Sequence, residues 1–592
     1  MLKNKPTKTI VSNKSFSFFE IFSFYWIVLA ILFLILALLD LFKKPILVGG
    51  IIIISALPYL LFKKKIISLS KFTEKERSTF FAIIVFCLIL SFFITPTIFG
   101  GRDEGSFSNA AILLSNDGGL THKNPLAKTL HELYGTGKAL NFPGFNYIES
   151  GELKSQFLPG YTAWLGALFG LGKLTALKFA NLFPLITLLF SFYLISQRII
   201  NNKFATYSTI LFATASPLII LNKFTLTEIF FAALTWFSLY LLLRYLENKR
   251  CLSDYWLIFL PLSLTIFVRI EAIAIIFMLF LILLLFDFNN LKKAQHQLPF
   301  FLLGLLVLLA ISFNPNFFAE NVKNIAKNLA PFITEKIHQS NQESSASVSS
   351  PFPNGDWTDF YLAKVLFNYH LLIWFLLTAI ALFYLVRKKQ WTTLIPFLFF
   401  APTLIYLLDA NISLDHPWML RRFIFSLIPL SVLYGIFLLN KIKNKKLSLA
   451  IILIILFANL WQALPFAFKS QNKNLFTNLN EITREFSNND LVLVSQKSTG
   501  SGWLLLSEPI RNIYKIPSVY FFRPSDLNVL SSNYTNVYLL VHPSELDLFK
   551  EIPKQSIKEL DLINQTIPPS RNPLEKPQWQ TLHTKLILYK LN

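Results

Sequence analysis

Cysteine and charge are both scarce in this sequence. Its 592 residues include only two cysteines, Cys87 and Cys251, and both stand near apolar segments. Two such thiols do not indicate a disulfide framework. Charged residues make up only 15% of the chain, whereas hydrophobic residues make up 54% and phenylalanine alone occurs 61 times. A soluble protein of this length needs more polar surface, so the composition favours a membrane protein.

A cleavable leader and internal repeats are not indicated either. The first apolar segment, residues 16–39, is longer than the core of a typical signal peptide, and no small-residue cleavage site follows it. We therefore expect this segment to be retained as a membrane helix. No solenoid-type repeat is visible in the chain.

Long apolar segments fill most of the chain. A spanning helix needs about 20 apolar residues, or fewer where neighbouring helices shelter its ends. By this measure we expect about thirteen spans in an α-helical polytopic membrane protein. Two short neighbours among them are also compatible with one hairpin that dips into the membrane. The predicted spans are 16–39, 45–62, 80–99, 177–195, 204–221, 229–246, 255–268, 272–286, 299–313, 365–386, 391–408, 423–439 and 447–466.

The formal net charge of +22 is distributed mainly in short basic runs between these spans. This pattern suits membrane orientation better than nucleic-acid binding, so no nucleic-acid partner is expected. If the N-terminus is cytoplasmic, every inside loop is basic, and Lys43-Lys44 is the one clear exception outside. We therefore predict a plasma-membrane protein with a cytoplasmic N-terminus. The basic residues of the inside segments are Lys3, Lys5, Lys8, Lys14, Lys63, Lys64, Lys65, Arg198, Lys203, Lys249, Arg250, Lys292, Lys293, Arg387, Lys388, Lys389 and the lysines from Lys441 to Lys446.

The composition divides the chain into three predicted regions. Residues 1–78 are expected to hold a cytoplasmic segment and an extra transmembrane hairpin. Residues 79–466 form the main transmembrane domain with large external loops at 100–176 and 314–364. Residues 467–592 are polar with strand-length apolar runs, which is typical of a small α/β domain, placed outside by the span count.

Two parts of the external loops have a distinctive composition. The segment 157–172, FLPGYTAWLGALFGLG, is apolar but short and rich in Gly and Pro, so we expect a juxtamembrane or re-entrant element at the outer face. The loop 314–364 contains the Ser-rich run SNQESSASVSSPFPNG, which predicts a flexible external segment. In the last region, the expected strands are Leu491 to Ser495, Val537 to Val541 and Lys585 to Leu591, and a helix is expected from Ser544 to Ile552.

Three charged residues follow the third apolar segment directly. We expect that helix to end at Gly100-Gly101, just before Arg102, Asp103 and Glu104. Adjacent carboxylates at a membrane surface are costly unless they bind a cation or a proton donor. Asp103 or Glu104 would then accept a proton from a hydroxyl or hold a divalent metal ion. Alternatively, these charges form a solvated helix end that marks the membrane interface.

Other charged residues are expected at the same outer face. Glu228 begins one span, and Arg269 and Glu271 lie between two others. His416, Arg421 and Arg422 precede a fourth. Arginine forks match phosphate oxygens, so the arginines favour an anion site; snorkelling interfacial charges are the alternative. A lone His beside Pro and Trp is more often structural. Together these residues suggest a phosphate-linked sugar held on arginines while a carboxylate activates a hydroxyl, and a phosphate leaving group needs no general acid.

Several motifs resemble the GT-C superfamily of polytopic glycosyltransferases, in the group around protein O-mannosyltransferases and the lipid A aminoarabinose transferase. The motifs are GGRDEGSFSNAA at 100–111, SQFLPGYTAWLGALFG at 155–170, VRIEA at 268–272 and HPWMLRRFIFSLIPL at 416–430. The resemblance covers most of residues 80–466. It implies an enzyme that takes sugar from a polyprenyl-phosphate donor at the non-cytoplasmic face.

The resemblance also implies roles for individual residues. Asp103 matches the position of the catalytic acidic residue, with Glu104 beside it, and Arg421, Arg422 and Arg269 would bind the donor phosphate. Further candidates for substrate or metal contacts are Arg102, His416, Glu228, Lys154 and Gln156. The sequence departs from the family at residues 16–62, an additional helix pair, and in its lack of a clear Glu-Lys-Pro-Pro element in the first large loop, so aminoarabinose and lipid A do not carry over.

The sequence therefore predicts an inverting membrane glycosyltransferase with Asp103 as base. Its partners would be a polyprenyl-phosphate-linked sugar, membrane lipid, and a glycan, lipid or protein acceptor; a divalent metal ion is a candidate cofactor. Two alternatives stay open, a transporter or flippase of lipid-linked sugar and an oligosaccharide ligase or polymerase. Transporters commonly place their charges near mid-membrane, whereas the candidate charges here cluster at span ends, which favours the enzyme.

Overall fold

The structure is a computed structural model, and it describes residues 14–63, 67–70, 72–149, 151–247, 250–333, 360–410, 412–499 and 504–591. Some of the predicted features lie outside these residues. They are the basic residues Lys3, Lys5, Lys8, Lys64, Lys65 and Lys249, and the Ser-rich run at 340–355.

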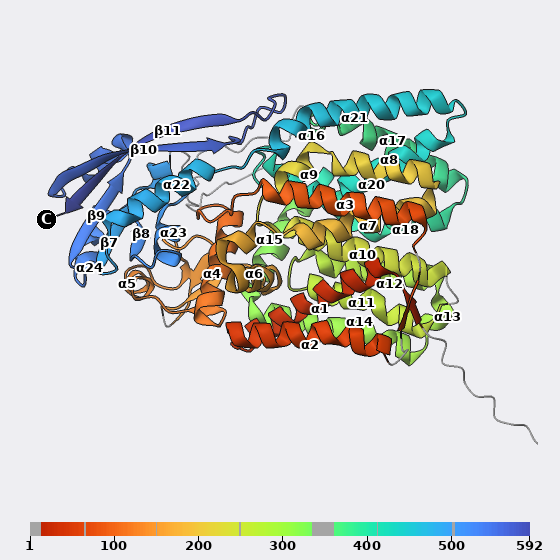
Figure 1. Cartoon of the computed structure of the whole chain (residues 1–592), viewed down its shortest axis with the longest axis horizontal. Coiled ribbons are helices and arrows are strands. Elements are labelled where there is room, and N and C mark those ends of the chain that lie inside the picture. The colour runs from red at the N-terminus through yellow and green to blue at the C-terminus, as the bar shows by residue number, and fades with distance from the viewer. Residues whose placement is uncertain are drawn as a thin grey trace, which may run out of the picture.

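A bundle of apolar helices forms the larger part of the molecule, and the helices run side by side in one general direction (Figure 1). Each of the thirteen predicted spans contains helix, although several are broken. The bundle consists of α1 (Phe18–Leu38), α2 (Lys44–Lys63), α3 (Glu74–Phe92), α7 (Leu182–Ile199), α8 (Asn202–Ala213), α9 (Ser216–Leu221), α10 (Thr227–Glu247), α11 (Leu252–Thr265), α12 (Glu271–Phe286), α14 (Ala294–Phe313), α16 (Tyr361–Asn368), α17 (Leu372–Arg387), α18 (Ile395–Phe400), α20 (Leu427–Lys441) and α21 (Lys445–Ala467).

Fewer helices than predicted are long and apolar enough to cross a membrane unaided. Within the described residues five meet this measure, or up to seven if each bent pair is one span, so the count of thirteen is not confirmed. The predicted span 204–221 breaks at Ala215, ahead of Pro217, because Pro217 has no N–H to bond the carbonyl of Ala213 and its ring would clash with that carbonyl. The predicted span 391–408 is divided into α18 and two short 3-10 turns, η1 (Trp391–Leu394) and η2 (Ala401–Leu407).

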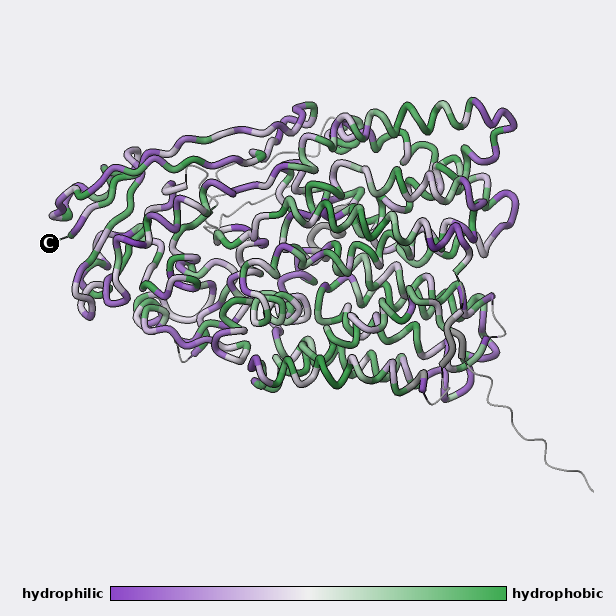
Figure 2. The backbone as a smooth tube through the Cα atoms, viewed as in Figure 1, coloured by the Kyte–Doolittle hydropathy of each residue, from purple (hydrophilic) through white to green (hydrophobic). Residues whose placement is uncertain are grey.

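The outer helices of the bundle present apolar side chains, whereas the central helix is enclosed. Ile53, Phe81 and Leu285 are each at least 66% exposed, while Trp236 in α10 is fully buried. Figure 2 shows the hydrophobic belt of the bundle between two more hydrophilic ends. Exposed large apolar side chains around a buried centre are what a lipid environment stabilises.

One end of the bundle carries folded structure built from the predicted loop 100–176. The loop contains a small antiparallel sheet in the order β3-β6-β5-β4. The apolar segment predicted at 157–172 is helical, and its helix breaks at Gly172 and Lys173. The elements of this loop are α4 (Asp103–Asp117), β3 (Thr121–His122), α5 (Pro125–Tyr134), β4 (Gly137–Lys138), β5 (Phe145–Tyr147), β6 (Leu153–Ser155) and α6 (Pro159–Leu177).

Two sequence-based boundaries were wrong. The helix expected to end at Gly100-Gly101 ends at Phe92, and residues 93–99 are not helical. Pro96 explains this early end, because it has no N–H to bond the carbonyl of Phe92, four residues earlier, and its ring would clash with that carbonyl. The predicted loop 314–364 begins with a further helix, α15 (Pro315–Ile333), which proline can open because its missing N–H is not needed at a first helical turn.

The C-terminal region has the α/β organisation that the sequence predicted. Its five-stranded sheet has the order β10-β11-β9-β7-β8. The three expected strands are confirmed, whereas the helix expected at 544–552 is a 3-10 helix, η7 (Pro543–Phe549). The strands are β7 (Asp490–Val494), β8 (Ser518–Tyr520), β9 (Asn536–Val541), β10 (Lys554–Thr566) and β11 (Gln580–Leu591), with helices α22 (Lys473–Ile482) and α23 (Ser507–Asn512) beside them.

This domain packs against the same end of the bundle as α4 (Figure 1). Asn512 in α23 donates a 2.8 Å hydrogen bond to Asn109 in α4, and both residues are buried. The connection between β10 and β11 reaches back to the bundle, where the backbones of Ser570 and His416 pair. The polar end of the molecule is therefore one continuous structure around α4.

Candidate functional site

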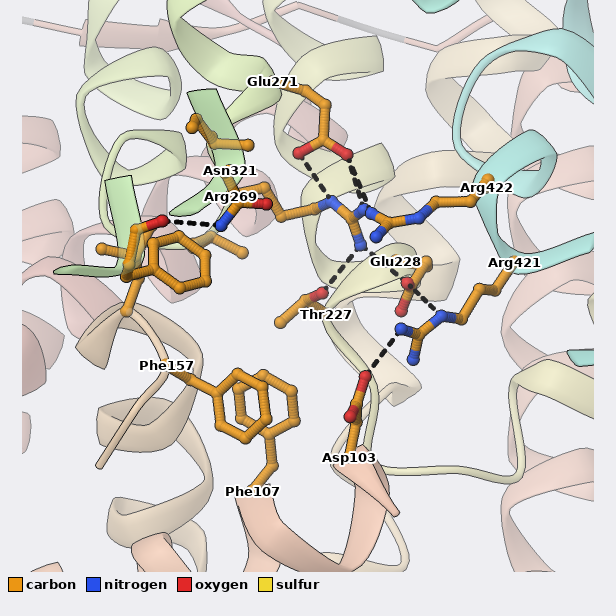
Figure 3. A pocket seen from close by; sticks show the side chains of 14 residues that line it. Asp103, Phe107, Phe157, Thr227, Glu228, Arg269, Glu271, Asn321, Arg421 and Arg422 are labelled. Carbon is orange, nitrogen blue, oxygen red and sulfur yellow. Dashed lines mark hydrogen bonds and ion pairs between the residues drawn. The ribbon is translucent and has the colours of Figure 1, made fainter. Parts of the chain in front are cut away.

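Asp103 is the first residue of α4 and faces a cavity at the polar end of the bundle (Figure 3). The helix starts against the non-helical segment before it: a Cβ on Gly105 would lie 1.7 Å from the carbonyl oxygen of Phe99. Only glycine permits this close approach of two backbones. The break after α3 and the glycine after Glu104 thus determine where the Asp103 carboxylate lies.

Arg421 provides the direct partner of Asp103. Its Nη2 lies 2.6 Å from Oδ2 of Asp103, and the arginine side chain is 9% exposed while the aspartate is 35% exposed. Arg421 begins the short helix α19 (Arg421–Ile424), and the chain bends by 59° between this segment and α20. The Trp418 ring lies 4.5 Å from the guanidinium of Arg421 and 4.7 Å from that of Arg102, so cation–π contacts hold both arginines.

Arg269 lies at the centre of a buried ion-pair network. Its Nη1 donates to Glu228 at 2.7 Å and to Thr227 at 3.0 Å. Its Nη2 donates to Glu271 at 2.6 Å, and Nε donates to the other oxygen of that carboxylate at 3.2 Å. A planar guanidinium fork suits this bidentate pairing, so Arg269 is fixed in place by its partners.

Arg422 and Arg421 are less fully paired than Arg269. Nη1 of Arg422 donates to Glu271 at 3.2 Å, and Nε of Arg421 lies 3.6 Å from Glu228. The Nε atoms of both residues are buried and have no hydrogen-bond partner among the described residues. A buried donor without an acceptor is costly, so these two arginines retain capacity to bind an anion.

The cavity between these groups has a volume of about 100 Å³. Formal charges balance in its lining, since Asp103, Glu228 and Glu271 oppose Arg269, Arg421 and Arg422. The remaining wall is aromatic and apolar: the rings of Phe107 and Phe157 stack with centroids 4.3 Å apart. The site therefore combines a small charged surface with an apolar side.

The two adjacent carboxyls have opposite pKa shifts. Burial raises the pKa of Asp103, but the charge and hydrogen bond of Arg421, with Arg422 and Arg102 nearby, outweigh it and hold the pKa below its usual value. Burial raises the pKa of Glu104 to about 7, and the attraction of Arg102 only partly offsets this. At neutral pH Asp103 is ionised, whereas Glu104 is partly protonated.

The structure brings together five of the predicted residues and separates the others. Asp103, Glu228, Arg269, Arg421 and Arg422 line the cavity. Glu104, paired with Asp103 in the sequence-based hypothesis, does not line it: successive helical residues diverge by about 100°, so its side chain is buried elsewhere, with Oε2 unpartnered among the described residues.

The remaining predicted residues have other surroundings. Arg102 donates to Asp415 at 2.9 Å instead of entering the cavity. His416 is buried between Tyr369, whose hydroxyl lies 3.1 Å from Nδ1, and the carbonyl of Asn572, 2.7 Å from Nε2, which is a structural role. Lys154 and Gln156 line a second, larger cavity beside the first.

A divalent metal ion does not fit the carboxylates of this cavity. Asp103, Glu228 and Glu271 are each paired with an arginine, which repels a cation. Within the described residues, no three His, Cys, Asp or Glu side chains converge as metal ligands.

Several lining residues were not predicted. Glu271 is the exception: it was expected beside Arg269 at the outer face, although no role at the site was assigned to it. Tyr406 does not line the cavity but donates to Glu271 at 2.5 Å; it lies within an apolar run and gave no signal in the sequence. Thr227, Phe107 and Asn321 were likewise found only when the fold placed them at the cavity.

Comparison with known proteins gave similarity in structure only. No family model matches the sequence, and no curated protein matches it. The oligosaccharyltransferase of Archaeoglobus fulgidus in the apo form matches with 12% identity and a TM-score of 0.47, over 79% of this chain and 70% of that chain. ArnT from Cupriavidus metallidurans in the apo state matches with 12% identity and a TM-score of 0.46, over 86% of this chain and 97% of that chain. The same ArnT bound to undecaprenyl phosphate matches with 11% identity and a TM-score of 0.49, over the same shares.

Proposed function

We propose that this chain is an inverting membrane glycosyltransferase, which transfers a sugar from a polyprenyl-phosphate donor to an acceptor hydroxyl with Asp103 as the base. One observation carries the proposal: an ionised carboxylate and a buried arginine with a spare donor face the same small cavity. A base beside an anion site is what such a transfer requires.

The donor phosphate would bind Arg421 and Arg422. Their Nε atoms lack acceptors among the described residues, so phosphate oxygens would satisfy them. Arg269 has a different role, because Glu228, Glu271 and Thr227 already occupy its donors. It orients the carboxylates that in turn position the other two arginines.

Phosphate binding also explains how a weak base becomes effective. In the unliganded site, Arg421 holds the pKa of Asp103 low. A phosphate that shares the Arg421 guanidinium adds negative charge nearby and weakens that ion pair, so the pKa of Asp103 rises. The carboxylate therefore gains basicity when the donor is in place.

The bonds formed and broken are as follows. Asp103 takes the proton of the acceptor hydroxyl, and the hydroxyl oxygen attacks the anomeric carbon of the sugar. The bond between that carbon and the phosphate oxygen breaks, and polyprenyl phosphate leaves as an anion on the arginines. One displacement inverts the anomeric centre, and no general acid is needed because the leaving group is already stable as an anion.

Replacement of Asp103 by Asn tests this proposal. Asp103→Asn keeps the side-chain shape but removes the base, so transfer should fall by a factor on the order of 10² to 10⁴. The measurement is release of polyprenyl phosphate from a purified polyprenyl-phosphate sugar by the full chain in lipid nanodiscs. Asp547→Asn, at an 84% exposed aspartate of the C-terminal domain, is the matched control and should keep wild-type activity.

The same assay separates the competing functions. Wild-type activity in Asp103→Asn would refute the base assignment. Movement of intact donor between leaflets without release of polyprenyl phosphate would indicate a flippase. Transfer of a preassembled oligosaccharide in one step, measured by mass spectrometry of the product, would indicate a ligase or polymerase.

We further propose that the polar end around α4 faces the outside of the plasma membrane. The basic residues Lys292, which follows α13 (Phe288–Leu291), and Arg387, the last residue of α17, belong to helices that reach the opposite end of the bundle, which supports this orientation through the positive-inside rule. In a Cys251→Ser background, Glu132→Cys in exposed α5 should react with an impermeant thiol reagent in intact cells, and Lys388→Cys should react only after permeabilisation. The reverse pattern would overturn the orientation.

A further inference from the structure

A second cavity of about 780 Å³ lies beside the Asp103 site. It lies between the small sheet of β4, β5 and β6 and the first turns of α15. Three residues line both cavities, namely Phe157, Phe317 and Asn321. A ligand in the larger space would therefore reach the Asp103 site across this shared wall, where Figure 3 shows Phe157 and Asn321.

The sheet side of this cavity is polar because of strand register. Asn146 lies opposite both Lys138 and Lys154 across the three strands, so these side chains share one face. Their neighbours Phe145 and Leu153 are buried in the core on the other face. Because successive strand residues face opposite sides, one amide and two amines form a row on the face toward the cavity.

On the helix side, α15 contributes one phenylalanine and two asparagines to the cavity from a single face. Phe317, Asn321 and Asn324 recur at intervals of four and three residues and hence lie on one face of α15. Two bonds hold the walls together: Lys154 donates to the carbonyl of Phe313 at 2.6 Å, and Asn314 donates to the carbonyl of Gln156 at 2.9 Å. The cavity thus lies between elements that hydrogen bonds hold together.

The chemistry of the lining indicates a neutral ligand with many hydroxyls. Its two lysines and two glutamates, Lys138, Lys154, Glu149 and Glu320, carry no net charge, which disfavours a polyanion. Carboxamides both donate and accept hydrogen bonds, as hydroxyls do, and phenylalanine rings offer flat apolar surface. The carboxamide residues of the lining are Asn146, Gln156, Asn314, Asn316, Asn321 and Asn324, and its phenylalanines are Phe157, Phe313 and Phe317.

We propose that this cavity binds a carbohydrate acceptor, a neutral oligosaccharide whose terminal hydroxyl reaches Asp103 past Phe157 and Phe317. The inference rests on the proposed function, since it specifies the acceptor of that same reaction. The volume lies within the range of about 300–1,000 Å³ that small-ligand sites occupy. A lipid acceptor tail would leave the amides without partners, and a peptide acceptor is the competing class that the experiment separates.

The test measures binding before turnover. The full chain in lipid nanodiscs is mixed with short neutral oligosaccharides of glucose, mannose, galactose or N-acetylglucosamine, or with neutral peptides rich in Ser, Thr and Asn. Saturation-transfer NMR reports which probes bind. Asn146→Leu and Asn324→Leu should each weaken oligosaccharide binding by about ten-fold or more. Asn528→Leu, at an exposed asparagine of the C-terminal domain, should leave it unchanged.

A second readout asks whether the bound oligosaccharide is the acceptor. With donor added, it should gain one sugar while polyprenyl phosphate is released, and both signals should fall in the two cavity variants. Binding of no oligosaccharide, binding that both cavity variants retain, or preferential binding of the peptides would overturn the proposal. The proposal would also be overturned if the oligosaccharide binds but gains no sugar while the enzyme releases polyprenyl phosphate from the donor. Failure of the proposed function looks different, because no polyprenyl phosphate would then be released from the donor under any condition.

Discussion

The two neighbouring cavities share Phe157, Phe317 and Asn321 but differ in everything else that lines them. The smaller one, about 100 Å³, is surrounded by three carboxylates and three arginines. The larger one, about 780 Å³, is lined by six carboxamides, three phenylalanines and a balanced set of two lysines and two glutamates. Paired charges dominate the lining of the first cavity, whereas carboxamides and aromatic rings outnumber the charged side chains in the lining of the second.

This difference suits the smaller cavity to the chemical reaction and the larger cavity to binding of a ligand. Paired charges at short distance stabilise a charge that changes during a reaction, because they are already oriented before it occurs. Amides and aromatic rings make many moderate contacts and suit a ligand that must be held without being altered. Variants on the two sides of the shared wall should therefore change different kinetic quantities.

The largest expected effect comes from Arg421. Arg421→Gln removes the partner of Asp103 and a phosphate donor together, so kcat/KM for the donor should fall by about 10²- to 10³-fold. Release of polyprenyl phosphate is the measurement. Arg523→Gln, at an exposed arginine of the C-terminal domain, is the matched control and should keep wild-type kinetics. Normal kcat/KM in the Arg421 variant would show that the charged cavity is not the site of the reaction.

A smaller effect concerns a carboxyl that lies outside both cavities. The pKa of Glu104 is raised to about 7 in the folded chain against an ordinary value of 4.5, so the folded state binds the proton more tightly. Stability is thus favoured at acidic pH and falls as pH rises from about 4.5 through 7. The penalty at pH 8 is on the order of 3 kcal/mol.

Glu104→Gln removes this penalty. Its thermal unfolding midpoint in nanodiscs should exceed that of the wild type at pH 8, and the gap should narrow as the pH falls toward 5. A gap that is constant across this range, or that widens toward acid, would contradict the burial-driven shift. The contrast with Asp103 shows how two adjacent carboxyls differ once one faces the cavity and the other is buried away from it.

The sequence predicted the charged residues better than their arrangement. Asp103, Arg269, Arg421 and Arg422 were found because charges at the ends of apolar segments are conspicuous. Their pairing was not predictable, because Arg421 and Asp103 are separated by most of the helical bundle in the chain and meet only after it is packed. The early end of α3 was missed because one proline, Pro96, outweighed an otherwise continuous apolar run.

The second cavity shows the same limit more strongly. Asparagines give no clear sequence signal for a site, since they also occur in turns and caps. Those of this cavity come from β5, from Asn314 at the end of α14, and from α15, a helix in a region that the sequence predicted as a loop. Lys154 and Gln156 were named as candidates for the Asp103 site, and the structure places them in its neighbour.

The central claim, that one cavity holds the donor and the other the acceptor, is tested most directly by initial rates over a grid of donor and oligosaccharide concentrations. Arg422→Gln should raise the donor KM by about ten-fold and leave the oligosaccharide KM unchanged, whereas Asn324→Leu should do the opposite. If both variants raise the same KM, the two cavities do not divide the substrates and the account is wrong.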